Sequence, residues 1–405
     1  MKKILALILV TFMLVSLFAC NASNSTYGDQ NNPGNSSTEG NENGNGEHNP
    51  SDSTNLLNSD AISHVYGGYS EGLLWVQKEG ETKKLYCIDK SGNVKFSIDG
   101  IATNAYEFSN EFAAIELRTD GLVICDKTGK ITTAEDLGGQ EILRCDFAAD
   151  YILVKRSTTT YMGTTNELAT FNTKFEKIVD FSSDLYEIYE NNRFYAYAFI
   201  DKYLLFFAED KYLDLSTGNV MDGKASLRSE IKVERESDFW VQEGYWGSVG
   251  GFYIYSKLDD ILRPGLSLTT NRTTMLNLNE NEKYAKIDEI GEFKNGMAPV
   301  TFEVNDNGNY TYYYTMMDEE GNFKFEPVKT SGAIIDYSFE DGYFVCTISP
   351  NKYVSPKVLE VYDMTGKLVA QKDYTYISSL VVSDGIVIVE ESKYHFYTMD
   401  LKPIF

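Results

Sequence analysis

Ile88-Asp89-Lys90-Ser91-Gly92-Asn93-Val94 is a polar turn, Asp-x-x-Gly, between two apolar runs. Asp at the first corner can accept a hydrogen bond from a backbone N–H two residues on, and Gly at the fourth position takes positive φ without steric cost. The turn therefore predicts a reversal between two antiparallel strands. It recurs at Cys125-Asp126-Lys127-Thr128-Gly129, Met317-Asp318-Glu319-Glu320-Gly321 and Tyr362-Asp363-Met364-Thr365-Gly366, and one residue longer at Leu213-Asp214-Leu215-Ser216-Thr217-Gly218.

A hairpin that returns along one chain predicts a repeat fold. Short apolar runs open the repeats, and they begin at Gly72, Phe112, Tyr151, Tyr203, Phe239, Gly296, Gly342 and Gly385. The spacing averages about 45 residues, the length of a four-stranded propeller blade. Aromatic residues make up 14% of the chain, and they favour strands. We predict an all-β fold, a β-propeller of about eight four-stranded blades, with seven blades as the alternative.

The two ends of the repeat region predict how the propeller closes. The last repeat starts at Gly385 and ends at Phe405, one strand short of four. Residues 61–66 precede the first apolar run and have no repeat of their own. We expect them to supply the missing outer strand, so that the first and last blades share one sheet and no open edge remains. The alternative is an open solenoid with a frayed N-terminus.

Residues 1–19 have the pattern of an export signal. A basic start, Met1-Lys2-Lys3, is followed by an apolar core at residues 4–18 that is too short to stay as a membrane-spanning helix. Leu17-Phe18-Ala19-Cys20 resembles the bacterial lipobox, although the pattern prefers a smaller residue than Phe18. The resemblance implies cleavage before Cys20 and a diacylglycerol on its thiol, which would anchor the protein to the outer face of the bacterial cytoplasmic membrane, in the cell envelope. The alternative is a secreted protein whose removed signal includes Cys20.

Composition separates a tether from the folded part. Residues 20–60 are rich in Asn, Ser and Gly with almost no apolar residues before Leu56, which predicts a disordered tether after the lipidated Cys. Residues 61–405 are expected to form the propeller domain, as a monomer. The net charge of −24 argues against nucleic acid as a partner and predicts repulsion from an anionic bilayer.

One loop is a candidate ligand site. Residues 244–251 contain Tyr245 and Trp246 among several glycines, and aromatic side chains on loops bind sugars and peptides. The alternative is a hairpin whose aromatic residues cap their own blade. The histidines and cysteines of the folded part do not indicate a chemical function. The two histidines, His64 and His395, are expected to lie too far apart to share a metal. The four cysteines are expected to be buried free thiols. We predict no catalytic residue, metal or cofactor.

Several segments together resemble the bacterial WG-repeat family. Phe293-Lys294-Asn295-Gly296-Met297-Ala298-Pro299-Val300 and Tyr69-Ser70-Glu71-Gly72-Leu73 match its opening strand, and Ile88-Asp89-x-x-Gly92 matches its turn. The usual Trp-Gly pair before the turn is missing, since Lys84-Leu85-Tyr86 stands there. The resemblance covers about residues 65–405 and implies a β-repeat protein with a binding or scaffold role.

Together these features predict a membrane-anchored, non-catalytic binding or scaffold protein outside the cytoplasm, with a glycan, peptide or envelope protein as ligand. One alternative is an envelope glycan hydrolase or lyase with paired carboxylates at the channel mouth. Another is an assembly factor that docks an envelope protein through a blade edge.

Overall fold

The structure is a computed structural model that describes residues 57–405, apart from 149, 182–196, 201, 207–210, 224–226, 228–238, 247–248, 257–271, 277–286, 292, 295, 307 and 319–321. This part of the chain is all-β, with a single short 3-10 helix, η2 (Ser59–Ala61), before the first strand. Leu57 is already buried, so order begins before the expected position 61. Within these residues no helix has the length and apolar character needed to cross a membrane.

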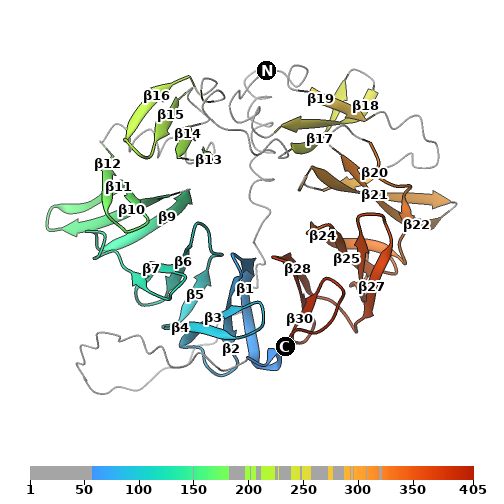
Figure 1. Ribbon diagram of the computed structural model, residues 1–405, viewed down its shortest axis with the longest axis horizontal. Helices are drawn as coiled ribbons and strands as arrows, with labels where there is room; N and C mark the ends of the chain where they lie inside the picture. Colours follow the sequence, from blue (N-terminus) through green and yellow to red (C-terminus); the bar gives the residue numbers. More distant parts are fainter. Residues whose placement is uncertain are drawn as a thin grey trace. The chain divides into compact units, whose positions relative to one another are not determined.

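The N-terminal half of the described chain forms antiparallel meanders (Figure 1). The first sheet has the order β1-β2-β3-β4. An eight-stranded sheet follows, with the order β12-β11-β10-β9-β7-β6-β5 and β8 paired to β7, and then a sheet of β13 to β16. The bounds are β1 (Ile62–Ser70), β2 (Leu73–Lys78), β3 (Lys84–Asp89), β4 (Val94–Asp99), β5 (Ala102–Ala105), β6 (Phe112–Leu117), β7 (Gly121–Asp126), β8 (Ile131–Thr132), β9 (Glu141–Ala148), β10 (Tyr151–Thr160), β11 (Gly163–Asn172), β12 (Lys177–Asp180), β13 (Tyr197–Ile200), β14 (Tyr203–Phe206), β15 (Lys211–Asp214) and β16 (Asn219–Asp222).

The C-terminal half continues in the same way, with sheets ordered β17-β18-β19, β20-β21-β22-β23, β24-β25-β26-β27 and β28-β29-β30. The bounds are β17 (Phe239–Trp246), β18 (Val249–Ser256), β19 (Arg272–Leu276), β20 (Ile287–Ile290), β21 (Met297–Asp306), β22 (Asn309–Asp318), β23 (Val328–Lys329), β24 (Ala333–Glu340), β25 (Tyr343–Ser349), β26 (Val358–Asp363), β27 (Leu368–Asp373), β28 (Ser379–Ser383), β29 (Ile386–Glu390) and β30 (Tyr394–Thr398).

The predicted closure by a shared sheet is wrong. Residues 61–66 contribute to β1, which pairs with β2 as the first strand of the first sheet, with Tyr66 opposite Trp75. Seven of the eight apolar runs are the second strand of their meanders, and the run at Phe239 begins β17, the first strand of its sheet. A second strand pairs with another strand along each of its edges. Where other sheets also cover both of its faces, its side chains are buried and apolar, as are those of Leu74, Trp75 and Val76 in β2. The first strands are more polar, and a search for apolar runs does not find them.

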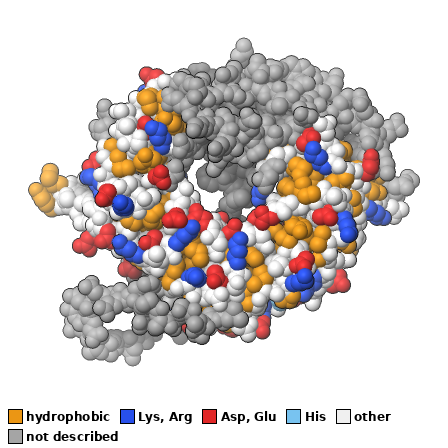
Figure 2. Space-filling model, in the orientation of Figure 1, with side chains coloured by type: hydrophobic (Ala, Val, Ile, Leu, Met, Phe, Trp, Pro, Cys, Tyr) orange, Lys and Arg blue, Asp and Glu red, His pale blue; other side chains and the backbone are white. Residues whose placement is uncertain are grey.

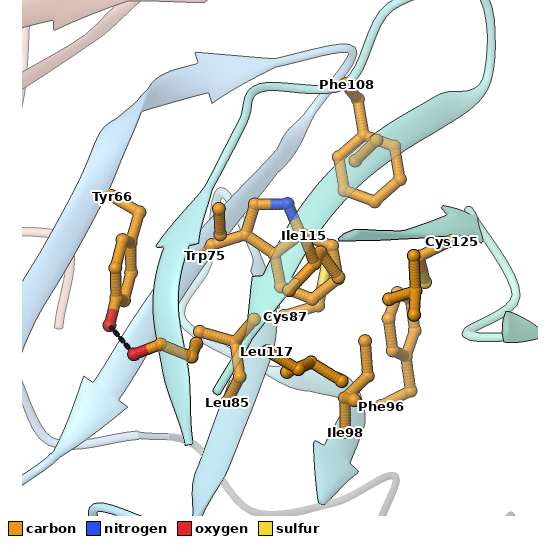
Figure 3. Packing of buried hydrophobic residues seen from close by; sticks show 14 residues of the cluster. Tyr66, Trp75, Leu85, Cys87, Phe96, Ile98, Phe108, Ile115, Leu117 and Cys125 are labelled. Atoms are coloured by element: carbon orange, nitrogen blue, oxygen red, sulfur yellow. Dashed lines mark hydrogen bonds between the residues drawn. The ribbon is translucent and has the colours of Figure 1, made fainter. Parts of the chain in front are cut away.

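Trp75 lies at the centre of the contact between the first sheet and the next (Figure 3). Its indole stacks on Phe108 at a centroid distance of 5.2 Å and meets the edge of Phe96 at 5.6 Å. Buried hydrophobic residues in the same way join β6 and β7 to β10 and β11, β10 and β11 to β14 and β15, β22 to β25 and β26, and β25 and β26 to β29 and β30. In each of these four contacts, strands pack on strands that follow them along the chain.

The last sheet packs on the first. Ile386, Ile388 and Phe396 share one hydrophobic cluster with residues of β1 to β4, and β1 lies beside β28 (Figure 1). The backbone N–H of Tyr69 donates to Ser383 Oγ at 2.7 Å, and that of Gly72 donates to Asp384 Oδ2 at 2.6 Å.

The contact between the first sheet and β5 to β7 is made by residues at positions equivalent to those that join the last sheet to the first. Ser70, the counterpart of Ser383, donates to the carbonyl of Phe108 at 2.6 Å. Glu71, the counterpart of Asp384, accepts from the N–H of Glu111 at 3.1 Å. The lysine after the turn aspartate completes both contacts, because Lys127 lies 2.7 Å from Glu71 and Lys90 lies 3.7 Å from Asp384. The last sheet thus contacts the first sheet in the same way as the first sheet contacts β5 to β7.

The turns that start at Asp89, Asp126, Asp214 and Asp363 form as predicted and have a second role in packing. Residues 319–321 of the predicted turn after Asp318 lie outside the described part. Asp89 Oδ1 accepts from the N–H of Ser91 at 2.9 Å, and Gly92 has φ +79°. The turn glycine of one sheet also lies against a side chain from the outer strand, or the segment beside it, of another sheet. A Cβ at the glycine would come within 3 Å of that side chain in four pairs: Gly92 with Phe405, Gly129 with Phe96, Gly218 with Val179 and Gly366 with Phe325.

The four cysteines of the described part are free thiols, as predicted. Cys87, Cys125 and Cys346 are buried, whereas Cys145 is only partly buried, so the prediction of burial is wrong for that residue. Burial raises the pKa of the three buried thiols well above its ordinary value, and it raises the pKa of Cys145 to about 12.

Because burial raises the pKa of these thiols, we expect the protein to lose stability at high pH. A thiol ionises near pH 8.5 in the unfolded chain but stays neutral in the folded one. Its contribution to the free energy of unfolding is therefore fully present below pH 8.5 and is lost as the pH rises above it. Each buried thiol should lower the free energy of unfolding by about 1.4 kcal/mol per pH unit above pH 8.5. Urea unfolding at pH 7 to 10.5 measures this, and Cys87→Ala should make the decline shallower. A free energy of unfolding that stays constant over this range would contradict the prediction.

Candidate functional site

A groove of about 620 Å³ lies beside the last sheet. This volume lies within the range typical of small-ligand sites. Three segments near the C-terminus form it, with Ser59 of η2 alongside. They are the end of β27 with the residues after it, the start of β30 with the turn before it, and the last residues of the chain. Its lining residues are Ser59, Lys372, Asp373, Tyr374, Thr375, Glu391, His395, Phe396, Tyr397, Pro403 and Phe405.

The groove lies where the last sheet has no full outer strand beside β30. The outer strand β4 of the first sheet is six residues long, but the last sheet has on its outer side only the single bridge between Tyr397 and Pro403. Two hydrogen bonds hold this bridge, from the Thr398 N–H to the carbonyl of Lys402 and from the Ile404 N–H to that of Phe396, each 3.0 Å long. The C-terminal segment therefore covers only the end of β30.

Polar groups on the side facing β27 are held by hydrogen bonds. Glu391 Oε1 accepts from the N–H of Thr375 at 2.9 Å, and the carbonyl of Glu391 accepts from the Tyr376 hydroxyl at 3.0 Å. His395 Nε2 lies 3.9 Å from Glu391 Oε2. These contacts fix the Glu391 carboxylate at the groove wall.

Aromatic rings form the rest of this side. The ring of His395 lies 6.0 Å from that of Tyr374 and 6.2 Å from that of Tyr397, and Lys372 Nζ lies 4.7 Å from the centre of the Tyr397 ring. The Tyr374 hydroxyl oxygen is buried beside the Tyr397 hydroxyl, and no described group donates a hydrogen bond to it. Burial, followed by the neighbouring Tyr397, raises the pKa of this hydroxyl well above its ordinary value.

The outer rim of the groove is apolar. Phe405 stacks on Phe396 with ring centroids 4.6 Å apart, and Pro403 adjoins them. Phe396 is 1% exposed, so the rim belongs to the packed core between the last and first sheets. The groove thus combines a rigid apolar edge with a polar, aromatic wall, an arrangement suited to binding.

Two carboxyl groups with a raised pKa lie elsewhere, on β24. Desolvation raises the pKa of Asp336 and of Glu340. Glu340 accepts hydrogen bonds from the backbone of Asp384 and Gly385 and lies 4.0 Å from Lys294, so it links neighbouring sheets. No group of three or more His, Cys, Asp or Glu side chains in the described part is placed to hold a metal ion.

The residues predicted as a ligand loop lie in a strand. Tyr245 and Trp246 end β17, where they pair with Gly250 and Val249 of β18. Residues 247 and 248, between these strands, lie outside the described part. Their side chains, like Cys20, lie outside the part that the structure describes. His64 lies on β1 and His395 on β30. Of these predicted positions, only His395 lines the groove.

An exposed apolar tip is a second surface feature. Tyr161 and Met162, 99% and 83% exposed, form the turn between β10 and β11, and an apolar tip projects at that place in Figure 2. Residues 157–165, which include this turn, contain no charged side chain. Nothing in the described chain covers this tip.

Comparisons with known proteins give structural similarity only. No family model and no curated protein matches the chain. A eukaryotic initiation factor matches at 12% identity and a TM-score of 0.36 over 80% of this chain and 82% of its own. Saccharomyces cerevisiae Sqt1 matches at 10% identity and a TM-score of 0.36, over 84% of this chain and 96% of its own. Kluyveromyces lactis Hsv2 matches at 9% identity and a TM-score of 0.33, over 83% of this chain and 92% of its own. These values are too low to transfer a function, so the function of this chain has to be inferred from its own strand pairing and groove.

Proposed function

We propose that the protein is an exported, lipid-anchored binding protein, and that its sheets form a closed β-propeller of eight blades. The blade count follows if the eight-stranded sheet is two four-stranded meanders, which only the pair Leu122–Ile142 joins. Every meander then has three or four strands. The contacts between last and first sheets support closure, because they repeat those between neighbouring sheets.

The groove beside β30 is the proposed ligand site, and its geometry is the observation that supports a binding function. A concave site with a few fixed polar groups between aromatic rings is typical of ligand recognition. Glu391 is fixed by the N–H of Thr375, so the polar wall needs little ordering when a ligand binds. The ligand is a glycan, a peptide or part of an envelope protein.

Histidine signals can test the groove in solution. The chain has only three histidines, so the imidazole resonances of residues 21–405 are readily assigned by NMR. Titration with glycan fragments and short peptides should shift the signals of His395 in a saturable way and leave those of His64 unchanged. A ligand that binds without moving the His395 signals would contradict the proposed site.

The lipid anchor predicts a clear effect of one substitution. Cys20→Ala should abolish incorporation of labelled fatty acid and release the protein from the membrane fraction, because two acyl chains supply most of the anchoring energy. The measurement is metabolic labelling followed by membrane fractionation. Cys145→Ala is the matched control and should keep both label and location. Unchanged labelling of Cys20→Ala would rule out the anchor. The WG-repeat resemblance stays a prediction.

A further inference from the structure

We infer that the groove beside β30 binds a cationic amine, either a free polyamine or the ammonium group of a lysine side chain. This inference rests on the proposed binding function and specifies the chemistry of its ligand. Three independent features of the wall support it: its carboxylates, its aromatic rings and one buried oxygen.

Two carboxylates, Glu391 and Asp373, and one ammonium group, that of Lys372, line the groove. Glu391 is 22% exposed at its side chain, and among the described residues the only cationic group within 4.0 Å of it is His395, which is charged only when protonated. Asp373 lines the same wall and has no ion pair in the described chain. A ligand anion would face both carboxylates, whereas a ligand cation would be attracted by both.

The rings offer faces to a cation. An ammonium group over an aromatic face is attracted by the negative charge on that face. Lys372 Nζ already occupies such a position over Tyr397. The rings of His395 and Tyr374, whose centroids lie 6.0 Å apart, extend the same wall. A bound ammonium group would therefore lie beside aromatic rings, as Lys372 Nζ does beside Tyr397.

The Tyr374 hydroxyl supplies a further acceptor. Its oxygen is buried beside the Tyr397 hydroxyl, and no described group donates a hydrogen bond to it. A phenol oxygen can accept a hydrogen bond from an ammonium N–H. A bound amine would therefore satisfy three types of group at once: a carboxylate, a ring face and a phenol oxygen.

The experiment is calorimetric titration of residues 21–405 with two probes, together with NMR of His395. The probes are spermidine and the tripeptide acetyl-Gly-Lys-Gly-amide, and the control is the same tripeptide with its lysine Nε-acetylated. We expect at least one amine to bind and shift the His395 signals, and the acetylated control to bind at least tenfold more weakly. Binding of spermidine alone identifies a free amine as the ligand, and binding of the tripeptide identifies a lysine side chain.

Two variants test the roles of the wall. Glu391→Gln keeps an acceptor for Thr375 but removes the charge, and should weaken amine binding about tenfold. Tyr374→Phe keeps the ring and should weaken it about threefold. Glu79→Gln, in an exposed turn of the first sheet, is the matched control and should have no effect. Unchanged thermal unfolding of each variant shows that its fold is intact.

Different failures have different meanings. If a neutral glycan or peptide shifts the His395 signals while both amines do not, the groove is a binding site but the inference about amines is wrong. Equal affinity for the lysine tripeptide and its acetylated form, or an unchanged affinity in Glu391→Gln, would overturn it in the same way. If no ligand of any class shifts the His395 signals, the proposed site fails as well.

Discussion

Replacing Trp75 with alanine is expected to lower the free energy of unfolding by about 3–5 kcal/mol. Trp75 is 1% exposed and stacks on Phe108, so the substitution leaves a cavity between the first two sets of strands. Its neighbours lie on rigid strands and can relax only in part. Urea unfolding monitored by circular dichroism measures the change.

Trp75→Phe is the matched control. The indole Nε1 is buried without a hydrogen-bond partner in the described chain, so phenylalanine loses volume but no hydrogen bond. The expected loss is about 1–2 kcal/mol. Equal losses for Trp75→Ala and Trp75→Phe would show that the ring does not fill this contact.

Replacing Gly129 with alanine should cost about 2–5 kcal/mol, for two reasons. Gly129 has φ +87°, which is strained for any residue with a Cβ. The added Cβ would also lie 2.7 Å from the Phe96 ring, in the contact between neighbouring sheets. The free energy of unfolding in urea again gives the measurement.

Gly80 separates the two causes. It has φ +79°, but a Cβ there would meet nothing within 4 Å. Gly80→Ala should therefore cost only about 1–2 kcal/mol, the conformational part. If Gly129→Ala costs no more than Gly80→Ala, the turn glycines have no role in packing one sheet on the next.

The sequence predicts the turns and the second strands because each has a local cause. Asp and Gly at fixed corners determine the reversal, and a strand buried on both faces must be apolar throughout. The first strands lack such a signal. In β1 the register shifts between Ile62 and His64, so the alternation of buried and exposed residues is interrupted. Because the repeats are counted from the apolar second strands, residues 61–66 fall outside the first repeat, and the wrong closure follows.

The groove could not be predicted because no single segment contains it. Tyr374 follows β27, Glu391 precedes β30, and Phe405 is the last residue of the chain. Their meeting depends on how the last sheet packs on both neighbours, which is a tertiary property. The sequence signal from this region points elsewhere: the last repeat has fewer strands than the others, which favours pairing with residues 61–66 over an open groove.

Closure of the last sheet on the first is the central claim, and the contact between Phe405 and Gly92 tests it most directly. A Cβ at Gly92 would lie 2.5 Å from the Phe405 ring, so the glycine protons and the ring protons must be close. In a sample of residues 21–405 with only Phe and Gly protonated, we predict a strong nuclear Overhauser effect between them, comparable to that between Gly129 and Phe96. A strong effect for Gly129 and Phe96 with none for Gly92 and Phe405 would show that the first and last sheets do not meet.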